Sequence, residues 1–180
     1  MGRKGKITLL TLSICLSLMF SSCSFVSDDE GAHPKEPHPD IILQNTVYTL
    51  GQSGERPVYI ESSRITFWSA DNRAETDKIT FHQADDEGNI TLEGSADHAD
   101  IDTDNRRMDL SGNVRLKRAD GNMQIEADEL TFDSKNEEIN APGSVHVSSD
   151  DGEFRGEGFN ADLLTSAYSF KSIQEGVFTL

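Results

Sequence analysis

Apolar and polar residues alternate along most of the chain after residue 40, which is the pattern of strands with one buried face. The clearest run has Met108, Leu110, Gly112, Val114 and Leu116 on one face, with polar residues between them. No long stripe with a helical period follows the N-terminal segment. The pattern therefore predicts an all-β domain with almost no helix.

Turn signals divide this alternation into hairpins. The first strand is expected over Ile41–Leu50, and turns rich in Gly, Asp and Asn are expected at Gln52–Pro57, Asp85–Asn89 and Ala119–Asn122. The apolar phase then shifts between Ile125 and Leu130, which predicts a bulge or corner at Ala127-Asp128-Glu129.

A short pattern recurs three times in the C-terminal half. It consists of an Ala-Asp pair followed by a glycine mark, the glycines being 31 and 33 residues apart: Ala99-Asp100 with Gly112-Asn113-Val114, Ala127-Asp128 with Gly143-Ser144-Val145, and Ala161-Asp162 with Gly176-Val177-Phe178. Such a period indicates stacked units that cannot bury their apolar faces alone. Glycine permits a tight bend or a close backbone approach, and Ala-Asp suits corners. We therefore expect a serial architecture of stacked hairpins.

The N-terminus has the plan of an export signal. Arg3, Lys4 and Lys6 precede an uncharged segment, Ile7–Phe20, and Ser21-Ser22-Cys23 then resembles a bacterial lipobox in which Cys23 is lipidated. The alternative is an uncleaved transmembrane anchor, because Ile7–Val26 is just long enough to span a bilayer. Both interpretations place residues 24–180 outside the cytoplasm and tethered to a membrane.

These features suggest three regions. Residues 1–22 are a signal peptide or membrane anchor, residues 23–40 are the lipidated Cys23 and a flexible tether, and residues 41–180 are the β domain. The tether contains Pro34, Pro37 and Pro39, which favour an extended spacer.

Composition narrows the function further. The formal net charge is −16, and removal of residues 1–22 would take away Arg3, Lys4 and Lys6 and deepen it to −19. This balance argues against nucleic-acid binding, which needs clustered basic residues. The two cysteines, Cys15 and Cys23, cannot form a disulfide framework once the leader is removed.

The sequence contains no recognisable catalytic constellation, so no enzyme, cofactor or metal site is predicted. There is no Gly-x-Ser-x-Gly elbow, phosphate loop or His-Glu-x-x-His segment. Asp100-x-Asp102-x-Asp104 resembles the start of a calcium loop but has Asn105 where glycine is needed and Ser111 where an acid is needed. By strand phase, the remaining candidates are surface histidines: His82, His98 and His146.

The order of the repeated marks resembles a known family. Ala127-Asp128, Gly143-Ser144-Val145, Asp151-Gly152, Gly156 with Gly158, and Ala161-Asp162-Leu163 are spaced as in the OstA-like domains of the lipopolysaccharide transport bridge. With an N-terminal anchor and a single domain, the chain is most similar to the LptC family. The resemblance covers residues 41–180. The lipobox departs from the single transmembrane helix common in that family.

The resemblance implies an open, V-shaped antiparallel β-jellyroll whose apolar interior shields acyl chains. It also implies partners: the membrane subunits of an ABC transporter at the N-terminal edge, and a periplasmic bridge protein of the same fold, joined by strand addition at the C-terminal edge. The cargo would be lipopolysaccharide or a related glycolipid. The location would be the periplasmic face of the inner membrane, with a lipid anchor, and the outer membrane is the alternative destination.

The inner-face residues offer an apolar trough for such a cargo. Because only 7% of the residues are aromatic, with one Trp and nine Phe, the chain has few residues for a thick two-sheet core, which favours a groove. The alternative is that the same residues form the ordinary core of a sandwich. The candidate trough residues are Phe67, Phe81, Leu92, Met108, Leu110, Val114, Leu116, Ile125, Phe132, Val145, Val147, Phe154, Phe159 and Phe170.

The C-terminal segment is a candidate docking edge. Val177, Phe178, Thr179 and Leu180 make a short, uncharged and largely apolar end, which favours backbone pairing with a partner strand. The alternative is that this strand pairs only within the domain. For the whole chain, the alternative function is that of a structural or surface-exposed β-rich lipoprotein without a carrier role.

Overall fold

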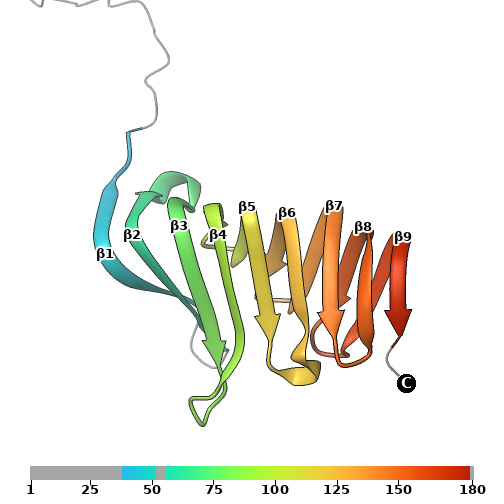
Figure 1. The fold of residues 1–180 in the computed structure, drawn as a ribbon. Coiled ribbons are helices and arrows are strands. Elements are labelled where there is room, and N and C mark those ends of the chain that lie inside the picture. The colour runs from blue at the N-terminus through green and yellow to red at the C-terminus, as the bar shows by residue number, and fades with distance from the viewer. Residues whose placement is uncertain (1–37, 52–55, 179–180) are drawn as a thin grey trace, which may run out of the picture. The chain divides into compact units, whose positions relative to one another are not determined.

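The computed structural model describes residues 38–51 and 56–178, which belong to one compact unit. They form a single nine-stranded antiparallel sheet in which every strand pairs with its neighbours in chain order (Figure 1). The strands are β1 (Ile41–Leu50), β2 (Val58–Trp68), β3 (Arg73–Ala84), β4 (Ile90–Asp102), β5 (Arg107–Arg118), β6 (Gln124–Asp133), β7 (Glu138–Ser149), β8 (Gly152–Asp162) and β9 (Ala167–Phe178).

Helix is almost absent from the described residues, as the alternation predicted. The helical elements there are two three-residue 3₁₀ turns, η2 (Ser69–Asp71) and η3 (Asp120–Asn122). None of the helices in this part of the chain has the length and apolar character needed to cross a membrane. The signal or anchor segment, Cys23 and most of the tether lie outside the described residues.

Every strand bends once near its middle, along a line that crosses the whole sheet. Strand pairing is interrupted there, for example between Ser95 and His98 on β4 and between Ser111 and Val114 on β5. Left-handed backbone conformations at Gly112 and Gly158 help the chain to turn. The corner line runs through Asn45, Ser63, Lys78, Asp97, Gly112, Asn113, Asp128, Gly143, Gly158 and Lys171.

The corner predicted at Ala127-Asp128-Glu129 is confirmed, because the register of β6 and β7 shifts between Ala127 and Thr131. The glycine marks at Gly112 and Gly143 also lie on the corner line. The third mark, at Gly176, lies away from the corner line, because β9 crosses that line at Lys171, opposite Gly158. Gly176 instead accommodates a close neighbour, since a Cβ there would lie 2.9 Å from Cδ1 of Phe154.

Two of the three Ala-Asp pairs are wrong as corners. On β4 the corner falls at Ala96-Asp97, three residues before Ala99-Asp100, and it lies 31 residues before the confirmed corner at Ala127-Asp128. Ala161-Asp162 ends β8 and begins a turn. The predicted corner on β4 was placed three residues too late because Ala-Asp occurs twice within Ala96–Asp100.

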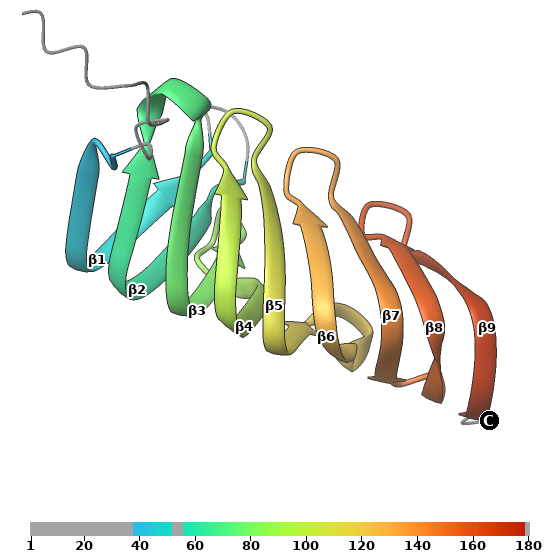
Figure 2. The same ribbon diagram turned by 90° about the horizontal axis from the view of Figure 1, so that it is seen from above.

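The corner line divides the sheet into two halves that face each other (Figure 2). Half I carries the turns 69–72, 103–106, 134–137 and 163–166, and half II carries the connections after β1, β3, β5 and β7. Aromatic rings meet between the halves: the centroids of Phe81 in half II and Phe132 in half I lie 6.1 Å apart. Tyr48 and Phe67 make a similar contact at 5.1 Å near the first edge.

One continuous apolar core fills the space between the halves. It extends from Leu50 and Val58 to Phe159 and Leu163, and burial of each large side chain contributes about 1.5–3 kcal/mol. The expectation that the chain lacks residues for a two-layer core is therefore wrong. Many medium-sized aliphatic residues on long strands supply the volume that few aromatic residues could not.

Three of the four turns of half I, 103–106, 134–137 and 163–166, share one design. In each, an aspartate at the end of a strand accepts backbone N–H bonds at Oδ1 from the residues two and three positions later. The residue four positions later has a left-handed backbone, with φ of 56–57°. These aspartates are Asp102, Asp133 and Asp162. The hydrogen bonds, chiefly from the backbone N–H of Asn105 and of Thr165, lower the pKa of Asp102 and of Asp162 below its ordinary value.

Successive turns are hydrogen bonded to one another. The backbone N–H of Thr103 donates to Asn72 O at 2.8 Å, and that of Leu163 donates to Glu137 O at 2.8 Å. A third bond of the same kind, at 3.1 Å, joins Ser134 to Arg106. The first turn of this series, 69–72, has no preceding turn to bond to within the described part of the chain. Its Ser69 N–H instead donates to a side chain, Asp40 Oδ2, at 2.6 Å.

Candidate functional site

The predicted trough residues lie together between the two halves of the sheet. Phe67 and Phe170 are half-buried near opposite edges and pack against the core. The other twelve are each at most 4% exposed: Phe81, Leu92, Met108, Leu110, Val114, Leu116, Ile125, Phe132, Val145, Val147, Phe154 and Phe159. The structure therefore brings the whole predicted set onto the inner faces.

The interior is filled by its own side chains in this conformation. A Cβ added at Gly94 would overlap the ring of Phe81, which itself stacks on Phe132. An acyl chain could enter only if the two halves separated. The core side chains would then contact the acyl chain in place of the opposite half. The interior is thus an apolar surface closed on itself.

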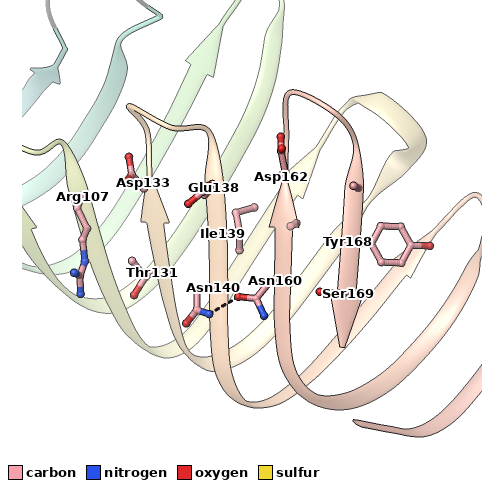
Figure 3. A pocket seen from close by; sticks show the side chains of 12 residues that line it. Arg107, Thr131, Asp133, Glu138, Ile139, Asn140, Asn160, Asp162, Tyr168 and Ser169 are labelled. Atoms are coloured by element: carbon pink, nitrogen blue, oxygen red, sulfur yellow. Dashed lines mark hydrogen bonds between the residues drawn. The ribbon is translucent and has the colours of Figure 1, made fainter. Parts of the chain in front are cut away.

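One depression among the described residues lies on the polar side of half I and has a volume of about 550 Å³ (Figure 3). Its wall includes Thr131, Asn140 and Asn160 on adjacent strands, and Asn140 Nδ2 donates to Asn160 Oδ1 at 2.6 Å. Asp133, Glu138 and other acidic or polar groups surround it. None of the predicted trough residues lines this depression, so it is separate from the trough.

The three histidines lie on the outer face and have nearby partners. His82 stacks on Tyr59 with a centroid distance of 5.1 Å. His98 Nδ1 lies 2.9 Å from Asp77 Oδ1, and His146 Nε2 lies 2.7 Å from Glu153 Oε1. Within the described ranges, no group of His, Cys, Asp and Glu is arranged to hold a metal ion.

The carboxylates that resemble a calcium loop serve other contacts. Asp100 Oδ1 accepts a bond from Arg73 Nε at 3.2 Å, whereas Asp102 accepts the turn amides described above. The two side chains thus bond to a neighbouring strand and to the chain's own turn.

Both edge strands expose apolar side chains. On β9, Ile173, Val177 and Phe178 are 55%, 69% and 72% exposed, and among the described residues β9 pairs only with β8. On β1, Ile41 and Val47 are at least half exposed. The candidate docking residues Thr179 and Leu180 lie outside the described residues. Pairing with β8 therefore uses one side of β9 and leaves its other side at the edge of the sheet.

The sequence pattern did not reveal the role of one half-buried basic residue, Arg118. Arg118 ends β5 in the same phase as Val114 and Leu116, and its side chain is only 15% exposed. That inner-face phase was a readable signal, because a basic residue there needs polar partners. Its partners lie 45 and 48 residues later in the chain, where no local pattern could reveal them.

Comparison with known proteins gave a family match, similarity to solved structures and one negative result. A family model described as "Lipopolysaccharide-assembly, LptC-related" matches residues 7–176. Among solved structures, the chain is similar to LptH from Pseudomonas aeruginosa, described as the LptA homologous periplasmic component of the conserved lipopolysaccharide transport device. The TM-score is 0.57 at 8% sequence identity, over 69% of this chain and 95% of that chain, which establishes a shared fold. A search of curated proteins found no match.

Proposed function

The chain belongs to the LptC-related family of lipopolysaccharide assembly, and we propose that its β domain shields acyl chains between the two sheet halves during their passage across the periplasm. Members of this family are periplasmic transport components and not enzymes, so the domain acts through binding alone. The energy for movement would come from the ATPase of its transporter partner. The domain itself would serve as a passive conduit.

The continuous apolar interior carries this proposal. Each CH₂ group of an acyl chain costs about 0.8 kcal/mol when exposed to water, so a lipid in transit needs apolar cover along its length. The inner faces of β2 to β8 supply such cover without interruption. Since strand pairing runs within each half and side chains make the contacts between the halves, the halves can part without breaking the strand ladder.

We further propose that β9 is the edge that accepts the next bridge protein. Its exposed Val177 and Phe178 suit pairing with a partner strand. The direction of β9 restricts that partner, because β1 and β9 both run from half I to half II. A second copy placed with its halves aligned would therefore pair β1 with β9 in parallel. A partner strand that runs from half II to half I would continue the antiparallel ladder, which is the more stable arrangement.

The N-terminal part of the proposal is a lipid anchor at Cys23, with β1 as the edge that meets the membrane subunits of an ABC transporter. The sequence from Arg3 to Cys23 supports it. Replacement of Cys23 by Ser should release the protein into the soluble periplasmic fraction. Retention in the membrane fraction would instead support an uncleaved anchor.

The filled interior favours one alternative function: a tethered β-rich lipoprotein that acts as a spacer and binds no lipid. The two functions differ in what reaches the inner face. Under the spacer function the core residues contact only one another, as in any sandwich. Under the carrier function they contact acyl chains during transport.

Site-specific photo-crosslinking in cells separates the two functions. A photoreactive phenylalanine analogue at Phe132, which is fully buried, should capture lipopolysaccharide. The same analogue at Tyr59, an aromatic residue that stacks on His82 on the outer face, is the matched control and should capture none. Capture at neither position, or equal capture at both, would favour the spacer function.

A further inference from the structure

Side chains connect the free ends of the two halves, opposite the corner line. Arg118, at the half II end of β5, donates from a guanidinium nitrogen to Leu163 O at 2.9 Å and to Ser166 Oγ at 3.2 Å. Both acceptors belong to the turn after β8 in half I. Asp120 Oδ2, 3.0 Å from the same nitrogen, holds the guanidinium from its own side.

A second contact of the same kind lies nearby. Arg56, just before β2 in half II, forms an ion pair with Glu137 Oε1 at 3.5 Å, and Glu137 lies in the turn after β6 in half I. The side chain of Glu137 is only 12% exposed. Since Leu163 N–H donates to Glu137 O, the two contacts end on adjacent, hydrogen-bonded turns.

The apolar core begins directly behind these contacts. Leu163, whose carbonyl accepts from Arg118, is itself a core residue that is 7% exposed. The core then continues to Phe132 and Phe81 between the halves. An acyl chain that enters between the free ends at these two turns must therefore pass Arg118 and Arg56.

We propose that Arg118 and Arg56 form a polar latch that holds the free ends of the two halves together, and that its release opens the interior to an acyl chain. This inference rests on the proposed carrier function. When the halves part around an acyl chain, the apolar faces exchange one apolar neighbour for another at little cost. An acyl chain offers no hydrogen-bond acceptor or charge to replace the latch contacts. The loss of these contacts therefore sets the free-energy cost of opening.

The latch can be tested in the full-length protein with Arg118→Met, which keeps side-chain length but removes the donors. Glu137→Gln removes the charge of the second contact. Arg115→Met is the matched control, because Arg115 lies on the same strand, faces outward with 73% of its side chain exposed, and pairs with Glu126 within half II. Hydrogen exchange reports opening without any lipid.

We expect Arg118→Met to accelerate exchange of the turn amides 163–166 about tenfold, and Glu137→Gln to accelerate it severalfold. Amides at the corner, such as that of Val114, serve as an internal reference and should keep their rates, which distinguishes local opening from global unfolding. Both variants should also raise the initial rate of lipopolysaccharide crosslinking at Phe132. Unchanged turn exchange relative to Arg115→Met, or acceleration at the corner as large as at the turn, would overturn the latch.

The lipid readout separates this proposal from the carrier function. Faster turn exchange together with unchanged lipid capture would show that the contacts stabilise the turns without gating the interior, and would overturn the latch. Absence of capture in every variant and in the unmodified protein would contradict the carrier function, and exchange would still decide whether the contacts hold the halves together.

Discussion

Asn113 Nδ2 donates a 2.6 Å hydrogen bond to Asp97 Oδ2 where β5 and β4 turn the corner together. The preceding residue, Gly112, has φ of 72°, and a Cβ there would lie 2.9 Å from Cβ of Asp97. On β5, the bend thus depends on a residue without a side chain, Gly112, beside an aspartate of β4. Local backbone conformation at the corner therefore helps to turn the two halves of the sheet toward each other.

We predict that Gly112→Ala destabilises the domain by about 2 kcal/mol, because it combines left-handed backbone strain with a close contact at Asp97. Chemical denaturation measures the change. Gly143→Ala is the matched control, since Gly143 lies on the same corner line with no atom within 4 Å of an added Cβ. It should be neutral or stabilising by up to about 1 kcal/mol. Equal effects at both positions would contradict this account of the corner.

The start of the turn ladder offers a second prediction. Asp40→Ala should cost about 1 kcal/mol of unfolding free energy, because the Ser69 N–H loses the acceptor that every later turn obtains from its neighbour. Hydrogen exchange at Ser69 should accelerate as well. Asp71→Ala is the control. It removes a carboxylate that lies in the same 3₁₀ turn but does not accept the Ser69 N–H bond, and it should have little effect on stability. A cost at Asp71 equal to that at Asp40 would argue against the cap.

The turn aspartates predict how stability depends on pH. The pKa of Asp102 and of Asp162 is lowered in the folded state by hydrogen bonds from turn N–H groups. Their contribution to stability is therefore complete above the unfolded-state pKa of about 3.9, and is lost as the pH falls below it through the folded-state values. The double variant Asp102→Asn/Asp162→Asn should lose less stability than the unmodified protein between pH 5 and pH 3. Parallel acid denaturation curves would contradict this assignment.

The edges of the sheet should differ in the partner that they bind. Deletion of Val177–Leu180 should weaken binding of the next bridge protein, because it shortens the free edge of β9 without removing core residues. Thermal unfolding should change by only a few degrees. The control is substitution of Ile41 and Ile42 by Ser on β1, which reduces exposed apolar surface at the other edge. It should leave binding of the next bridge protein unchanged. A pull-down with the purified partner measures both effects, and unaltered binding after the deletion would remove β9 from the interface.

Local pattern was enough to predict the all-β class and many element bounds. The prediction of a strand over Ile41–Leu50 was correct to the residue, because alternation and the following glycine are both local signals. The corner at Ala127-Asp128 was found from a change of phase. Its counterpart at Ala96-Asp97 was missed in favour of a second Ala-Asp pair three residues later.

Contacts between distant segments could not be predicted. The capping of Ser69 by Asp40 spans 29 residues, and the bond from Arg118 to Leu163 spans 45. Such partners depend on how the halves fold over each other, which alternation does not encode. The filled interior was also beyond reach, because a period-2 pattern places a residue on a face without showing what covers that face.

The central claim is that acyl chains enter between the two halves of the sheet. The most direct measurement is methyl NMR of the purified protein with lipopolysaccharide that carries a spin label on an acyl chain. The account predicts selective broadening of interior methyls such as those of Leu116, Val145 and Val147, with those of exposed Val47 and Leu164 sharp. Broadening confined to the exposed methyls, or none at saturating lipid, would contradict it.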